Sequence, residues 1–258
     1  MRRQVREIYE YREMLKNLVA KELRTRYKGS VLGFLWTFFN PLFLLIIYST
    51  VFSFVMRVQI ENYTMFLFVA LLPWNYLASS VLQGLVSIVQ NGSLVKKIYF
   101  PREVLPLSIV MTNLINYLLS LLILLPALII FKVRLTPALF AFPLILGVET
   151  LLVASLVLLL SVANVYFRDL EHIAGIIITA WFFLTPVFYP ASIIPLKLKA
   201  FFYLNPITPV IESFRNVFFY GTWPEWNSLG ILALGSLILL FLSLAIFEHF
   251  QKAVAEEI

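Results

Sequence analysis

The stretch VLPLSIVMTNLINYLLSLLILLPALIIF, from Val104 to Phe131, contains no charged side chain and decides the class of fold. A helix of about 20 apolar residues crosses the roughly 30 Å of hydrocarbon in a bilayer. A segment of this length and composition therefore predicts a membrane-spanning helix, with length to spare for tilt.

Five other stretches have the same character, and what lies between them is mostly too short to fold independently. The sequence therefore predicts an all-α integral membrane protein with six transmembrane helices in one domain of residues 1–258. The overall composition agrees, because 61% of the residues are hydrophobic and 13% are charged, against roughly 45–50% and 25% in an average soluble domain. The predicted spans are residues 31–56, 63–89, 104–131, 137–166, 173–189 and 229–247.

The residue types that usually carry catalysis or bind metals are scarce. The chain has no cysteine, and its two histidines, His172 and His249, are far apart in sequence, so we expect no disulfide, no metal site and no catalytic residues. It also contains no G-x-x-x-x-G-K-[ST] phosphate loop. We therefore expect no cofactor in this chain, and any energy from ATP has to come from a partner.

The distribution of lysine and arginine predicts the orientation. Cationic loops are retained on the cytoplasmic side of a membrane. With the N-terminus inside, 14 of the 20 lysines and arginines fall in cytoplasmic segments, so both termini, including the tail 248–258, are predicted to be cytoplasmic. Topology and anionic lipids account for the net charge of +6, which requires no nucleic-acid partner.

The N-terminal residues 1–30 have the pattern of an amphipathic helix. Ile8, Tyr11, Leu15 and Leu18 recur at steps of three and four, with charged side chains between them. We expect this helix to lie at the cytoplasmic membrane interface among the lipid headgroups. The alternative is a solvated helix that packs on a partner.

A short cytoplasmic turn, residues 94–103, combines aromatic and cationic side chains. Phe100 precedes Pro101, which disfavours helix at that point and predicts a break between two helical pieces. An exposed aromatic pair next to cations is typical of a docking surface for another protein; the alternative is that the aromatics anchor the chain at the interface. The residues of this candidate docking turn are Lys96, Lys97, Tyr99, Phe100, Pro101, Arg102 and Glu103.

The segment 190–228 on the other side is far too apolar for an ordinary loop. The Asn205–Pro209 break divides it into two pieces, each long enough for half a bilayer if helical. This pattern predicts a re-entrant hairpin that gates a conduit, with Thr208 as a cap and an ion pair from Glu212 to Arg215; a cap lying flat on the membrane is the alternative. The candidate gate residues are Phe201, Phe202, Tyr203, Asn205, Pro206, Pro209, Glu212 and Arg215.

The second predicted span carries polar side chains along one face, namely Asn75, Ser79, Gln83 and Ser87. Such a stripe either lines an aqueous pathway or hydrogen-bonds to another helix; small residues at Ser80 and Gly84 favour close helix packing. Glu149 is the only acidic residue deep in a span, where it marks either function or a structural hydrogen bond. With 16% aromatic residues, an aromatic and amide-lined conduit would suit a glycan, although belts at the interface also use aromatics.

Four segments resemble the membrane subunit of bacterial ABC exporters for O-antigen and teichoic acid polysaccharides, a type-2 ABC transporter family. They occur in the family's order and cover nearly the full length. In this sequence they read YKGSVLGFLW (Tyr27–Trp36, followed by Pro41), KIYFPREVLP (Lys97–Pro106), NVYFRD (Asn164–Asp169) and LNPITPVIESFR (Leu204–Arg215).

The resemblance implies a homodimer that binds two copies of a separate ATPase subunit, which holds ATP and Mg, and that exports a lipid-linked glycan across the bacterial inner membrane. It also implies that 94–103 is a coupling helix on the ATPase, that 1–30 is an interface helix, and that 196–220 forms an outer gate. O-antigen is the expected cargo, with teichoic acid, capsule or an amphipathic drug as alternatives. A membrane-bound transferase, or a channel that works without an ATPase, is disfavoured because clustered acids, histidines and intramembrane charges are lacking.

Overall fold

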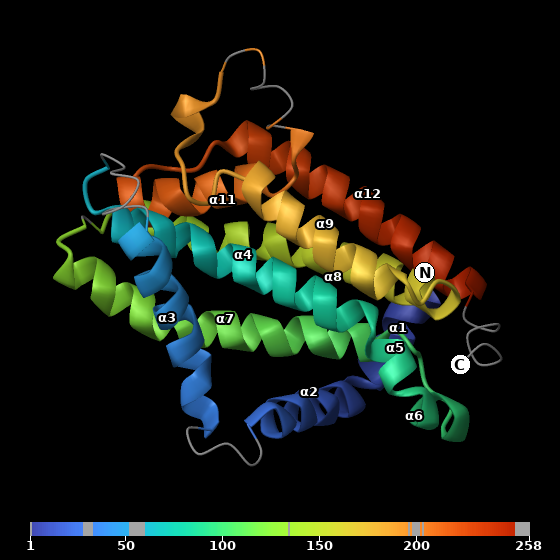
Figure 1. Cartoon of the computed structure of the whole chain (residues 1–258). Helices are drawn as coiled ribbons and strands as arrows, with labels where there is room; N and C mark the ends of the chain where they lie inside the picture. Colours follow the sequence, from blue (N-terminus) through green and yellow to red (C-terminus); the bar gives the residue numbers. More distant parts are fainter. Residues whose placement is uncertain are drawn as a thin grey trace.

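The computed structural model describes residues 2–27, 33–51, 60–133, 135–195, 197, 202 and 204–250. Within these ranges every regular element is a helix, which confirms the all-α prediction. Four helices are long and apolar enough to cross a membrane, and they run side by side as the main bundle in Figure 1. They are α4 (Tyr63–Leu85), α7 (Val104–Ile130), α8 (Phe142–Tyr166) and α12 (Trp226–Phe250).

Two shorter apolar helices occupy the other two predicted spans, so the structure supports four full spans and leaves the predicted six unconfirmed. α3 (Trp36–Thr50) lies obliquely across α4 and α7, and residues 31–32 and 52–56 of its predicted span fall outside the described ranges. α9 (Leu170–Leu184) ends five residues before the predicted boundary, because Thr185 precedes Pro186 and adopts the extended conformation that proline favours.

α4 is the central helix of the bundle, and it contacts α3, α7, α8, α9 and α11. Its predicted span to residue 89 is interrupted at Val86, after which the short α5 (Ser87–Gln90) begins. Gly84 allows α8 to approach closely, since a Cβ atom at this position would stand 2.3 Å from a methyl carbon of Val157. The predicted small-residue packing on α4 is therefore present at Gly84.

Serine hydroxyls connect α8 and α12, the pair of helices in most extensive contact. Ser155 donates to the carbonyl of Ser236 at 3.1 Å, and Ser243 donates to the carbonyl of Ser155 at 2.9 Å. Interhelical hydrogen bonds of this kind contribute about 0.6 kcal/mol each in membrane proteins. They fix the register of two helices whose leucine-rich surfaces alone would specify it poorly.

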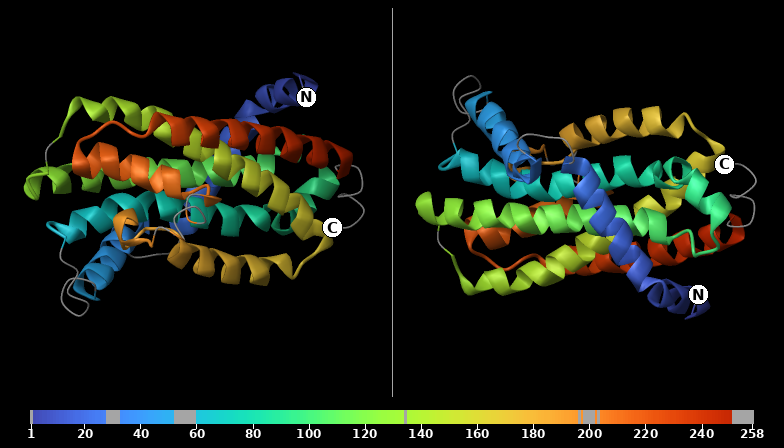
Figure 2. Two further views of the ribbon diagram at one scale, coloured as in Figure 1. Left: turned by 90° about the horizontal axis from the view of Figure 1, so that it is seen from above. Right: turned by 90° about the horizontal axis from the view of Figure 1, so that it is seen from below.

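The N-terminal segment forms two helices, α1 (Arg2–Glu10) and α2 (Arg12–Tyr27), where one was predicted. α2 crosses α7 obliquely, on the same side of the bundle as α3 (Figure 2). Leu18 is buried in a cluster with Phe100, Val104 and Phe247. Part of the apolar face of α2 is therefore covered by this chain's own helices, and its placement at the membrane interface stays a prediction.

The two ends of the bundle differ. We call the end that carries α1, α5 and α6 (Gly92–Lys97), at the right of Figure 1, the base. The last turns of α8 and α12 also pack there. The opposite end, the top, holds α11 (Thr208–Arg215) and the π-helical turn Asn216–Tyr220, both packed against α4. Between α7 and α8 the chain makes a 3-10 turn, Pro137–Ala141, and further 3-10 turns lie at Gly33–Leu35 and Ala191–Ile193.

Candidate functional site

The predicted docking turn at the base presents one aromatic ring to the surroundings and buries the next. Tyr99 is 83% exposed, whereas Phe100 is 3% exposed and packs in the cluster with Leu18 and Val104. The prediction of an exposed aromatic pair is therefore wrong for Phe100. The predicted helix break is present, because the chain is extended at Ile98 and stays non-helical through Pro101 before α7 begins.

The other residues of this turn divide in the same way. Lys96 and Lys97 are exposed in the last turn of α6, and Ile98 is 55% exposed beside Tyr99. Pro101 and Glu103 are buried, and Arg102 is half-buried between them. The exposed surface of the turn therefore consists of two cations followed by two apolar side chains.

The N-terminal helices hold the docking turn from one side. The Tyr11 hydroxyl, at the junction of α1 and α2, donates to the carbonyl of Tyr99 at 3.4 Å. Lys21 of α2 donates to the side-chain oxygen of Asn91, just before α6, at 3.5 Å. A displacement of the docking turn would therefore be transmitted to both α2 and α7.

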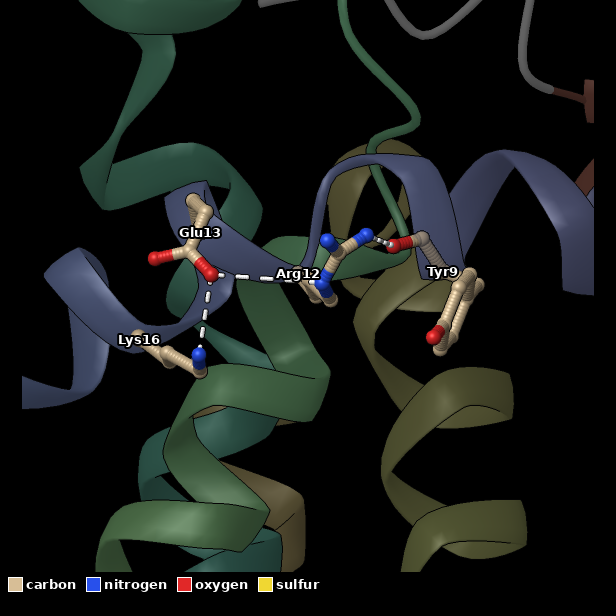
Figure 3. A network of polar contacts seen from close by, with 4 residues as sticks. All are labelled: Tyr9, Arg12, Glu13 and Lys16. Carbon is tan, nitrogen blue, oxygen red and sulfur yellow. Dashed lines mark hydrogen bonds and ion pairs between the residues drawn. The ribbon is translucent and has the colours of Figure 1, made fainter.

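A group of surface contacts shapes the junction of α1 and α2 (Figure 3). Arg12 donates to the carbonyl of Tyr9 at 3.3 Å and lies over the Tyr9 ring, and Lys16 donates to Glu13 at 2.9 Å. Exposed ion pairs of this kind contribute little to stability. They lie on the exposed surface beside Tyr11, whose hydroxyl bonds to the docking turn.

Glu103 is a buried carboxyl group at the start of α7. One of its oxygens has no hydrogen-bond partner in the described part of the chain. Burial raises the pKa of the Glu103 carboxyl above its ordinary value, and the nearby carboxylates of Glu7 and Glu248 add to this effect, while Arg102 opposes it. Carboxyl groups from α1, α7 and α12 are thus brought together at the base.

At the top, Asn205 uses its whole amide to join α9 to α11. Its side-chain oxygen accepts from the indole N–H of Trp181 at 2.7 Å and from the backbone N–H of Ile207 at 3.1 Å. Its amide nitrogen donates to the hydroxyl of Thr185 at 2.9 Å and to the carbonyl of Leu184 at 3.3 Å. Asn205 is therefore a structural link between the end of α9 and the start of α11.

Arg215 is 2% exposed and extends from the end of α11 to the backbone that follows α9. Its guanidinium donates to the carbonyls of Pro186 and Val187, and to that of Tyr189 at 3.2 Å. It also lies 3.7 Å from the centre of the Phe66 ring. Because the Tyr63 hydroxyl donates to Phe188 at 2.8 Å, four successive carbonyls are bonded to two side chains.

The remaining gate predictions have mixed outcomes. Phe201 and Tyr203 lie outside the described residues, and the Phe202 ring is 6.3 Å from that of Tyr189. Pro209 occupies the first turn of α11 as predicted, but the Thr208 hydroxyl is buried and caps nothing. Pro206 and Glu212 are half-buried, and the Arg215 guanidinium bonds to carbonyls where an ion pair with Glu212 was predicted. α11 is thus a buried half-length helix, while most of the first piece of the predicted hairpin is outside the described residues.

The polar stripe of α4 meets a cavity of about 410 Å³ between α3, α4 and α7. Asn75 and Ser79 line it, and Gln83 accepts a hydrogen bond from Asn113 of the lining at 3.2 Å. Ser87 belongs to α5 and donates to the carbonyl of Gly84 at 2.6 Å. The structure therefore brings three of the four predicted residues to one place and separates Ser87 from them.

The cavity also contains residues that the sequence did not mark as one site. α7 contributes a polar face at steps of three and four, and that spacing is the signal that could have identified it, whereas the contribution of α3 depends on the angle at which it crosses. The full lining is Trp36, Asn40, Pro41, Leu44, Leu72, Asn75, Tyr76, Ser79, Asn113, Asn116, Tyr117 and Ser120.

Glu149 lies inside α8, fully buried, and neither of its carboxyl oxygens has a partner in the described part of the chain. The adjacent Thr150 accepts a hydrogen bond from Tyr76 at 3.3 Å. The predicted structural hydrogen bond of Glu149 is therefore not observed. Among the described residues, no group of three or more histidines, aspartates or glutamates could hold a metal ion.

Comparison with known proteins identifies relatives over the whole chain. The model of the ABC-2 type transporter family matches residues 13–219. An O-antigen export system permease protein RfbA from Myxococcus xanthus is 40% identical over 100% of both chains, and one from Klebsiella pneumoniae is 35% identical over 95% of this chain and 94% of its own. The polysialic acid transport protein KpsM from Escherichia coli is 25% identical over 92% of this chain and 93% of its own. These matches confirm the resemblance seen in the four sequence segments.

Proposed function

We propose how this chain works, since it belongs to the ABC-2 type transporter family and is the membrane subunit of a transporter, not an enzyme. Two copies form a homodimer that binds two ATPase subunits, which hold ATP and Mg. Together they export a lipid-linked polysaccharide of the O-antigen type from the cytoplasm across the bacterial inner membrane. The base faces the cytoplasm with both termini, and the top faces outward.

The nature of the cargo rests on the relatives and on the chemistry of the cavity. The identity to O-antigen export permeases reaches 40%, against 25% for the polysialic acid transport protein, which favours O-antigen over capsule. A cavity lined by Asn75, Ser79 and Asn113 offers amides and hydroxyls to a cargo rich in hydroxyl groups. Polar groups of this kind are costly in hydrocarbon and are expected where water or substrate passes.

The docking turn supports a mechanism of coupling to ATP. Tyr99, with Lys96 and Lys97, is exposed where an ATPase could contact it, and Phe100 is buried against α2 and α7. The proposal rests on the position of the exposed Tyr99 directly before the buried Phe100. A force that the ATPase exerts on Tyr99 would be passed through Phe100 to α2 and α7. Closure of the ATPase pair would displace α2 and α7 together, and the conduit between the two copies would open at the top, past α11.

The structure changes which variant tests this coupling. Phe100→Ala would leave a cavity in the base, at a cost of about 3–5 kcal/mol, so a loss of transport would not be specific. Tyr99→Ala removes an exposed ring and should reduce both ATP-driven export and cargo-stimulated ATP hydrolysis by about tenfold. Proteoliposomes with both subunits provide both readouts, and co-purification reports whether the ATPase still binds.

Tyr220→Ala is the matched control, because Tyr220 is also exposed, at 53%, but lies at the top. It should leave ATP hydrolysis unchanged. If Tyr99→Ala retains normal binding, hydrolysis and export, the docking assignment is wrong. Light scattering of the purified complex tests the dimer, and a single copy of this chain per complex would contradict it.

A further inference from the structure

The cavity between α3, α4 and α7 combines apolar side chains with uncharged polar ones. Its polar side chains are amides and hydroxyls, and none of the described residues that line it is charged. Its volume of about 410 Å³ falls within the roughly 300–1,000 Å³ of small-molecule sites. A lining without charge does not suit a phosphate, a metal ion or a charged lipid headgroup, and it favours a neutral polar ligand.

One of the amides in this cavity is buried without a partner. Both polar atoms of the Asn116 side chain make no hydrogen bond within the described part of the chain, and the half-buried Asn75 faces the same cavity. Buried polar groups are nearly always paired, because an unpaired one costs about 1–3 kcal/mol. Asn205, which uses every polar atom of its amide, shows that this fold can satisfy an asparagine fully. Asn116 therefore has unused hydrogen-bonding capacity for something that enters the cavity, and the partly exposed amide of Asn75 is accessible from the same space.

Aromatic rings stand next to these amides. Tyr76 of α4 and Tyr117 of α7 stack with their ring centres 5.8 Å apart, and Trp36 of α3 lies at the cavity wall. Tyr76 already donates its hydroxyl to Thr150, so its ring is held in place. Aromatic rings bind the C–H faces of sugars while amides bind their hydroxyls.

We propose that this cavity is a saccharide-binding subsite, in which Asn75 and Asn116 bind the hydroxyls of a sugar unit and Trp36 contacts its ring. The inference rests on the proposed function, since it takes the exported glycan as the source of the sugar. α3 forms one wall of the cavity and contacts both α4 and α7, so a movement of α3 relative to them would change the shape of the subsite.

Photocrosslinking in cells that make their own surface polysaccharide tests this subsite, whichever sugar that polysaccharide contains. Leu44 of α3 lines the cavity, and the adjacent Phe43 is 52% exposed and does not. After acid hydrolysis of the glycosidic bonds of the crosslinked cargo, Leu44→p-benzoylphenylalanine should give a peptide that carries a hexose or similar sugar mass, and Phe43→p-benzoylphenylalanine should give lipid adducts only. Lipid adducts alone at position 44 would overturn the subsite.

Asn116→Leu provides the second test, with Asn164→Leu as its control. Asn164 is also a buried asparagine with an unpaired oxygen, but it lies near the base end of α8, outside the cavity. Asn116→Leu should lower both the sugar adduct at position 44 and the surface polysaccharide by about tenfold, while Asn164→Leu should change neither. An unchanged adduct in Asn116→Leu would refute the subsite.

The same cells separate this inference from the proposed function. Deletion of the chain should abolish surface polysaccharide, and persistence of the polysaccharide would refute the proposed function itself. If deletion abolishes it but Asn116→Leu preserves both export and adduct, the exporter assignment stands and only the subsite is wrong.

Discussion

Polar side chains at the top of the bundle are paired far more fully than Asn116 in the cavity between α3, α4 and α7. At the top, Asn205 bonds to the end of α9 and to the start of α11, and Arg215 donates to the backbone that follows α9. In the cavity, the side chain of Asn116 makes no hydrogen bond within the described part of the chain. Both regions are rich in amides and aromatic rings, so composition does not distinguish them. The difference lies in whether the polar groups are paired, and it separates a structural cap from a place that receives a ligand.

The largest expected effect is at the top. Arg215→Met would leave three carbonyls without donors, and each buried unpaired group costs about 1–3 kcal/mol, so we expect a loss of roughly 3–5 kcal/mol and little folded protein. Arg215→Lys should restore only part of it, since an ammonium cannot reproduce the planar fork of the guanidinium. Thermal unfolding in detergent measures both. A Tm close to the parent's would show that the cap is not structural.

A smaller loss of stability is expected where α4 meets α8, away from the cavity lining. Gly84→Ala would place a Cβ atom 2.3 Å from Val157, and overpacking of this kind costs about 1–3 kcal/mol. Gly147→Ala on α8 is the control, because a Cβ atom there meets nothing within 4 Å. Equal Tm values for the two variants would contradict the tight contact.

Glu103 is a buried group with an unpaired oxygen that can also ionise, so its contribution to stability should depend on pH. Because its pKa is raised by burial, the protonated form favours folding, and stability is lost as the pH rises from the ordinary carboxyl value through the raised one. Glu103→Gln cannot ionise, so the Tm difference between pH 5 and pH 8 should be smaller in the variant than in the parent. An identical pH dependence would show that Glu103 does not titrate in that range.

The smallest effect on stability is expected for Asn116→Leu, the same change that should reduce export. It removes no hydrogen bond and adds an apolar side chain, so the Tm should stay within about a degree or two of the parent or rise. A large fall in Tm would show that Asn116, like Arg215, mainly stabilises the fold, and the proposed difference between Asn116 and the paired residues at the top would be wrong.

The sequence predicted the helical class and the long spans well, because lipid demands runs of apolar residues. The boundaries of α7 were correct to one residue. The sequence could not predict the burial of Phe100 or of the apolar face of α2, because both depend on how the helices cross in the folded protein. The same limit applies to the cavity. The regular spacing of polar residues on α4 and α7 is visible in the sequence, but the sequence does not show that these two polar faces lie together beside α3. Arg215 was expected to pair with the nearby Glu212, and instead it bonds to backbone carbonyls about 28 residues earlier in the chain.

The packing of α2 on α7 also constrains how the protein is made. α2 ends at Tyr27 and α7 begins at Val104, so the ribosome synthesises the helix long before its binding surface exists. At about 5–20 residues per second, the delay is roughly 4–15 s. During that interval Leu15 and Leu18 have no protein to cover them, and the nascent helix has to rest on the lipid surface or a chaperone before it docks.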